Sequence, residues 1–127
     1  MGPVEIHLRR LQERAPGATA TVAPGAGWIV CVPNIDLPPG WSKAHSQIRF
    51  VAPTGYPFAQ PDCFWADADL RLANGNTPQA SNPNNALPGS AEPGLWFSWH
   101  LQQPWNPNRD DFLTWLAVIR QRFARAL

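Results

Sequence analysis

Proline is the residue that most restricts the fold of this chain, because fifteen prolines are spread through its 127 residues. Proline fixes φ at about −65° and has no amide donor, so each one ends a strand, forms a turn or stands in the first turn of a helix. We therefore expect short elements joined by rigid turns rather than a helical bundle. Disordered chains are poor in aromatic residues, whereas seven tryptophans and six phenylalanines indicate a packed core here.

Length and charge narrow the class of protein further. A chain of 127 residues is enough for one domain with its own core but not for two, so we expect a single domain over residues 1–127. The net charge of +1 gives no basic surface for nucleic acid. No apolar run approaches the roughly 20 residues that span a membrane, and no secretion signal is visible. We expect a cytoplasmic protein that binds neither nucleic acid nor membranes.

The two cysteines, Cys31 and Cys63, both fall in apolar, strand-like runs. They could pair across a sheet, but two free thiols are expected in a cytosolic protein. Neither cysteine has the spacing of a zinc site, so we expect no metal. Nothing in the sequence implies another cofactor.

Hydrophobic periodicity and turn residues predict the order of the secondary structure. Residues 4–14 carry apolar side chains at helical spacing after Pro3, and Pro16-Gly17 ends that run. Alternating and β-branched residues then predict four antiparallel strands. These strands are expected at residues 18–23, 28–32, 45–51 and 63–66. The second of them is expected to end at Pro33.

The second half of the chain predicts a long loop and a final helix. Residues 74–93 consist largely of Asn, Pro, Gly and Ser, and a loop of this length is unusual in a compact domain unless it has a function. Asp110 and Asp111 place negative charge at the start of the last helix, and apolar side chains recur at helical spacing as far as Phe123. A helix, a four-stranded meander, a long loop and a closing helix predict an α+β fold.

Two proline motifs carry a resemblance to a known family. Tyr56-Pro57-Phe58-x-x-Pro61 follows the third predicted strand, and Trp105-x-Pro107 precedes the last helix. Together they resemble the ubiquitin-conjugating enzyme (UBC-like) superfamily, and segments 61–65 and 96–100 resemble its bacterial branch. The resemblance implies a UBC-like fold and two partners, a ubiquitin-like modifier and its ATP-using activating enzyme. It also implies a JAB-type metallopeptidase in the same pathway.

The resemblance also indicates where the catalytic residue should lie. Counting back from Trp105 by the family's spacing reaches Phe97, but no cysteine occurs after Cys63. Ser98 and His100 stand beside that position, and a serine hydroxyl needs a base to take its proton. On an extended segment the residues at i and i+2 share a side. We hypothesise that Ser98 carries the modifier as an oxyester, with His100 as base and Asp110 or Asp111 orienting the imidazole.

Three alternatives stay open at the level of sequence. Ser98 and His100 are plain polar residues if the chain is a non-catalytic module that binds the modifier or its activating enzyme. Cys63 or Cys31 is the nucleophile in a second alternative, although small thiols in strands are usually inert core groups. Exposed tryptophans stack on carbohydrate in a third, but no paired carboxylates have the spacing of a glycoside hydrolase.

Overall fold

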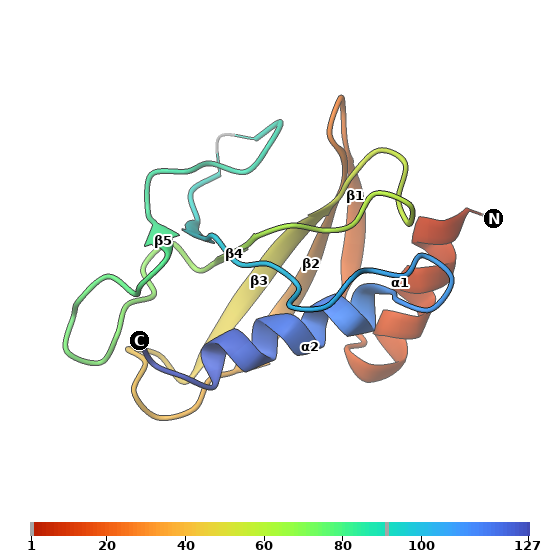
Figure 1. Ribbon diagram of the computed structural model, residues 1–127. Coiled ribbons are helices and arrows are strands. Elements are labelled where there is room, and N and C mark those ends of the chain that lie inside the picture. Colours follow the sequence, from red (N-terminus) through yellow and green to blue (C-terminus); the bar gives the residue numbers. More distant parts are fainter. Residues whose placement is uncertain (1, 91) are drawn as a thin grey trace.

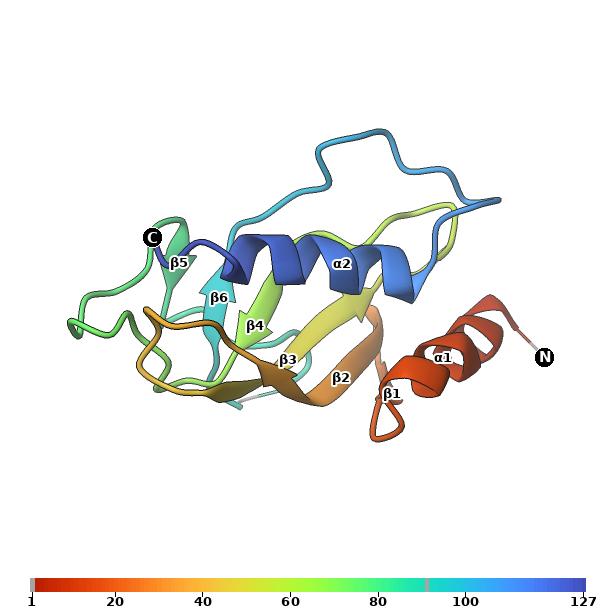
Figure 2. The same ribbon diagram turned by 90° about the horizontal axis from the view of Figure 1, so that it is seen from below.

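The computed structural model describes residues 2–90 and 92–127, which form two helices and one antiparallel sheet of six strands. Helix α2 lies across one face of the sheet, and α1 lies beside β1 and the start of α2 (Figures 1 and 2). The order of the strands in the sheet is β1-β2-β3-β4-β6-β5. The elements are α1 (Pro3–Arg14), β1 (Thr19–Ala23), β2 (Gly27–Asp36), β3 (His45–Ala52), β4 (Phe64–Ala66), β5 (Ser81–Asn82), β6 (Leu95–Phe97) and α2 (Phe112–Phe123).

The α+β class predicted from the sequence is confirmed, but the predicted number of four strands is wrong. The additional strand β6 pairs with β4 on one side and with β5 on the other. Strand β5 lies inside the segment 74–93 that was expected to be a loop. It has only two residues, and so short a strand shows no periodicity from which it could be predicted.

Two strand boundaries also differ from the prediction. Strand β2 continues past Pro33, because its pairing with β3 shifts register between Val32 and Ile35. Such an irregularity leaves residues out of the hydrogen-bond ladder, and a proline is tolerated there. Strand β4 begins at Phe64 rather than at Cys63, whose φ of 59° is incompatible with a strand.

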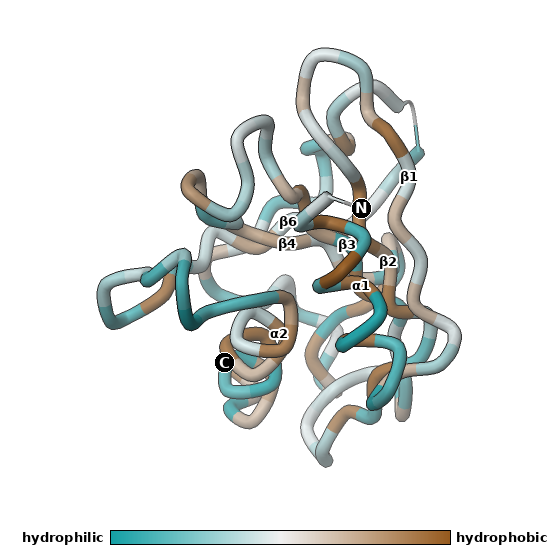
Figure 3. The backbone as a smooth tube through the Cα atoms, turned by 90° about the vertical axis from the view of Figure 1, so that its right-hand side faces the viewer, coloured by the Kyte–Doolittle hydropathy of each residue, from teal (hydrophilic) through white to brown (hydrophobic). Residues whose placement is uncertain are grey.

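Aromatic side chains fix α2 on the strands that lead to the candidate site. The rings of Phe64 (β4) and Phe97 (β6) are stacked with centroids 4.8 Å apart. Phe123 of α2 meets both rings edge-on, at 5.5 Å and 5.6 Å. All three side chains are buried, and burial of each contributes roughly 1.5–3 kcal/mol. Apolar residues, brown in Figure 3, recur along the central strands and α2.

The two proline motifs, far apart in the sequence, meet in space. Trp105 Nε1 donates a 2.7 Å hydrogen bond to the Pro57 carbonyl oxygen. The ring of Tyr56 stacks on Phe112, the first residue of α2, with centroids 4.7 Å apart. His7 of α1 lies edge-on to Phe112, and its Nδ1 is 2.6 Å from the Tyr56 hydroxyl. Helix α1, the turn at Tyr56 and the start of α2 therefore form one contact cluster.

Helix α2 begins with a capping box formed by Asp111 and Thr114. The Asp111 carboxylate accepts hydrogen bonds from the backbone amides of Leu113 (3.0 Å) and Thr114 (3.2 Å). The Thr114 hydroxyl accepts in return from the Asp111 amide at 3.1 Å. These bonds satisfy amides that would otherwise lack a partner in the first turn of the helix.

We expect Asp111→Ala to lower the free energy of unfolding by about 1 kcal/mol, because alanine has no acceptor for the cap. Asp111→Asn keeps an acceptor oxygen, so its free energy of unfolding should fall clearly less. Urea denaturation followed by circular dichroism measures both losses. Equal losses in the two variants would assign the effect to the charge of Asp111 rather than to the cap.

We expect mild acidification to destabilise the fold through His7. Burial lowers the pKa of His7 from its ordinary value of 6.5, and the nearby Asp111 carboxylate offsets only part of this. Protonation is then easier in the unfolded chain, so stability is highest above pH 6.5 and decreases as the pH falls from there toward the lower pKa of the folded state. The melting temperature should drop between about pH 7.5 and about pH 5.5, and should drop less in His7→Gln. An equal drop in both proteins would exclude His7 as the cause.

Candidate functional site

The segment Ser98-Trp99-His100 leaves the end of β6 and stays bonded to its neighbours. The Ser98 amide donates to the Ala80 carbonyl oxygen at 2.7 Å. On the other side, the Trp99 carbonyl oxygen accepts from the Cys63 amide at 3.0 Å. Ser98 is half-buried and His100 is exposed, so solvent reaches both residues. The pairing of β6 thus continues into the segment that carries the predicted nucleophile and base.

The His100 ring is held by Asp62. His100 Nδ1 and Asp62 Oδ1 are in direct hydrogen-bond contact, and their side chains are 65% and 62% exposed. A carboxylate only accepts hydrogen bonds, so in neutral His100 the proton is on Nδ1 and the lone pair of Nε2 is free. Sequence reasoning missed Asp62, because its contact with His100 depends on the pairing between Cys63 and Trp99.

Asp110, predicted as a partner of His100, is instead buried at the turn before α2. Its carboxylate accepts from the Asn106 amide at 2.8 Å, the Arg109 guanidinium at 3.3 Å and the Thr114 hydroxyl at 3.5 Å. The hydrogen bond from Arg109 is the main reason that the pKa of Asp110 lies below its ordinary value. The contact predicted for Asp110 or Asp111 is therefore made by Asp62 in this structure.

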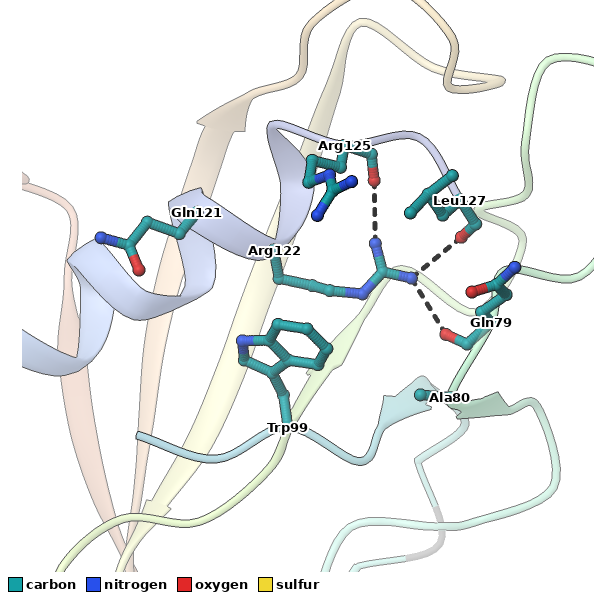
Figure 4. A pocket seen from close by; sticks show the side chains of 7 residues that line it. All are labelled: Gln79, Ala80, Trp99, Gln121, Arg122, Arg125 and Leu127. Atoms are coloured by element: carbon teal, nitrogen blue, oxygen red, sulfur yellow. Dashed lines mark hydrogen bonds between the residues drawn. The ribbon is translucent and has the colours of Figure 1, made fainter. Parts of the chain in front are cut away.

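The aromatic neighbours of Ser98 lie on the side of the segment that faces α2. Both Phe97 and Trp99 have their rings against the guanidinium of Arg122, and Figure 4 shows the contact with Trp99. On extended backbone, successive side chains point to opposite sides. This alternation predicts that Ser98 and His100 point away from α2, toward the side on which Asp62 meets His100.

Cys63 lies in the same region, directly after Asp62. Cys63 and Cys31 are both free, as the sequence predicts. Burial raises the pKa of the Cys63 thiol, a hydrogen bond with Trp96 opposes this, and the charge of Asp62 adds to it. Burial also raises the pKa of Cys31. A thiol with a raised pKa is mostly protonated at neutral pH, which disfavours nucleophilic attack.

Residues 2–90 and 92–127 contain neither a metal-ligand cluster nor a membrane-spanning helix. In this part of the chain no three or more His, Cys, Asp or Glu side chains gather as they would to hold a metal ion. Within the same residues, neither helix has the length and apolar character needed to cross a bilayer.

The contact with Asp62 predicts the tautomer of His100. In neutral His100 the proton should reside on Nδ1, because Asp62 accepts it there. Asp62→Ala should abolish this preference, whereas Asp36→Ala, which removes an exposed partner of His45, should leave His100 unchanged. Ring ¹⁵N chemical shifts measure the tautomer directly. A His100 ring with the proton on Nε2 in the unmodified protein would contradict the assignment.

The comparison with protein families agrees with the motifs and the fold. Residues 9–126 match the family model described as Prokaryotic E2 family E. This match runs from within α1 to beyond the end of α2. Neither a curated protein nor a solved structure matches the chain. The chain therefore belongs to Prokaryotic E2 family E, a family of bacterial proteins that resemble ubiquitin-conjugating enzymes.

Proposed function

We propose that this protein is a carrier in a bacterial ubiquitin-like modification pathway and holds the modifier as an oxyester on Ser98. Membership of an E2-like family supports the ubiquitin-conjugating-like role in general. His100 lies two residues after Ser98, and its contact with Asp62 is the observation that supports the chemistry. Residues 1–127 act as a single domain in this proposal.

The reaction needs a nucleophile, a base and a group that orients the base. Ser98 Oγ attacks the carbonyl carbon of the thioester between the modifier and its activating enzyme. His100 Nε2 takes the hydroxyl proton and passes it to the departing thiolate, so a C–O bond replaces a C–S bond. A target amine then attacks the ester, a C–N bond replaces the C–O bond, and Ser98 regains its proton. Asp62 keeps the proton of neutral His100 on Nδ1 throughout.

One contact that the mechanism needs, between Ser98 and His100, has to form when the substrate binds. Within the described residues, the His100 ring bonds to Asp62 rather than to the Ser98 hydroxyl. Catalytic hydrogen bonds are often long or unformed before the substrate binds. The proposal requires Ser98 Oγ and His100 Nε2 to approach to about 3 Å when the thioester is bound. His100 and Asp62 are both largely exposed, so the bonded pair can shift together toward Ser98.

The pathway supplies the energy and the other partners. The activating enzyme uses ATP to form the thioester, so the carrier itself needs no cofactor. The modifier is a ubiquitin-like protein whose C-terminal carbonyl is transferred. The resemblance to the bacterial branch adds a JAB-type metallopeptidase to the same pathway.

A non-catalytic binding module is the second candidate, favoured by one surface residue. Phe58, in the turn after the Tyr56–Pro57 bond, is 81% exposed. Aromatic side chains are enriched in protein–protein interfaces, and Phe58 is exposed enough to make such a contact. In this alternative the chain binds the modifier or its activating enzyme, and Ser98 forms no bond to either.

The nature of the adduct tests the two candidates. The protein is incubated with ATP, a ubiquitin-like modifier and the activating enzyme of that modifier. We expect an adduct that survives reducing agent and is cleaved by hydroxide, because an oxyester resists thiols. Ser98→Ala should abolish it, and Ser98→Cys should convert it into an adduct that reducing agent cleaves. Intact mass spectrometry measures all three.

Cys63→Ala is the matched control, because it removes the nearby thiol and leaves no nucleophilic atom in its place. It should form the adduct as the unmodified protein does. An adduct that persists in Ser98→Ala and disappears in Cys63→Ala would identify Cys63 as the nucleophile. Binding of the activating enzyme without any adduct, weakened by Phe58→Ser, would establish the binding module instead.

A further inference from the structure

Arg122, near the end of α2, is a buried cation with an unusual set of partners. The residue is 4% exposed, and its guanidinium donates to three main-chain oxygens. These belong to Arg125 (3.0 Å), Gln79 (2.9 Å) and Leu127 (2.9 Å), as the dashed lines in Figure 4 show. No Asp or Glu side chain is among these partners, and the Leu127 oxygen is that of the last residue in the sequence. The guanidinium therefore joins the end of α2 to the segment that leads into β5.

The faces of the same guanidinium lie against rings on both sides of Ser98. Its central carbon is 5.1 Å from the centroid of Phe97, 5.5 Å from that of Trp99 and 5.6 Å from that of Trp41. These distances are within the range of cation–π attraction. Phe97 and Trp99 are the residues directly before and after Ser98, so Arg122 contacts both neighbours of Ser98.

A third restraint reaches the backbone of Ser98 itself. Arg122 binds the Gln79 carbonyl, and the next carbonyl along the chain, that of Ala80, accepts from the Ser98 amide at 2.7 Å. Ala80 has a φ of 56°, a conformation that is strained for a residue with a side chain and persists only where the surroundings hold it. The bond from Arg122 to the preceding residue provides such a hold.

A buried guanidinium is costly, so its presence in an aromatic core calls for a reason. Burial lowers the pKa of Arg122, and an apolar side chain of similar size would avoid that cost. What arginine adds is a rigid, planar set of donors that fixes the direction of each contact. A cavity of about 140 Å³ adjoins Arg122, Trp99 and Gln79, which gives Trp99 space to move if the guanidinium is removed.

We propose that Arg122 is a positioning residue that fixes the segment 97–100, and with it Ser98 and His100, without touching the reacting atoms. Its consequence for transfer rests on the proposed function. The positioning itself is a property of the free protein and is measured without any partner.

Hydrogen exchange in the free protein is the first test, with Arg122→Met, Arg122→Lys and the control Arg125→Met. Arg125 is exposed, and its side chain lines the same cavity, so its replacement removes an equal charge without removing the three hydrogen bonds. In Arg122→Met the exchange rate of the Ser98 amide should rise, and the factor of this rise should be at least about ten times larger than the factor for any amide of β2 or β3. In Arg122→Lys, which keeps a cation under the rings, the exchange rate of the Ser98 amide should lie between the rates in the unmodified protein and in Arg122→Met.

A purely structural role would produce a different pattern. Loss of global stability accelerates the amides of β2, β3 and Ser98 by the same factor, and that result would overturn the proposal. Arg122→Lys keeps the test decisive if Arg122→Met does not fold. A second pattern would also exclude positioning. In it, the exchange rate of the Ser98 amide is unchanged in Arg122→Lys and rises in Arg122→Met only together with the rates of the whole sheet.

The rate of oxyester formation on Ser98 is the second test. In a single turnover, Arg122→Met should lower the maximal rate at least about tenfold, since a small displacement of a reacting group is costly. The concentration of charged activating enzyme at half the maximal rate should stay the same, and Arg125→Met should match the unmodified protein. An unmodified protein that forms no ester would reject the proposed function, while hydrogen exchange still decides the positioning. An unchanged maximal rate in Arg122→Met would refute the role in transfer.

Discussion

The stacking of Phe64 on Phe97, with Phe123 across both rings, is the contact on which the arrangement of this protein depends. These side chains belong to β4, β6 and α2, so one aromatic cluster joins the sheet to the helix that covers it. Because protein cores are close-packed, the position of Phe97 also determines where the next residues go. The segment 98–100 therefore starts from a fixed point of the core, although all three of its residues are at least partly accessible to solvent.

The two sides of that segment have different functions in our interpretation. Toward α2, Phe97 and Trp99 lie against a buried cation, and the surrounding contacts are those of a core. On the opposite side, the exposed pair of His100 and Asp62 provides an imidazole with a defined tautomer. A reactive group needs access to solvent and partners, whereas its placement needs a rigid support. On an extended segment the side chains alternate between two sides, so neighbouring residues can provide the rigid support and the exposed reactive group.

The sequence predicted much of the fold because most elements are long enough to show a period. The helix expected at residues 4–14 is observed at Pro3–Arg14, and the motifs around Tyr56 and Trp105 do meet. The two-residue strand at Ser81–Asn82 was missed, since so short an element leaves no pattern. Pro33 was misread as the end of a strand, because an irregular register that tolerates proline depends on the partner strand.

The candidate site shows the same limit. Ser98 and His100 were found because their identity and spacing follow from the chain itself. Asp62 and Arg122 were not, since both act through contacts between residues far apart in the sequence. The sequence by itself determined the α+β class, the family motifs and the nucleophile–base pair that we propose. Only the tertiary structure decided which carboxylate meets His100 and which cation lies behind Ser98, because antiparallel pairing and the packing of α2 bring those side chains together.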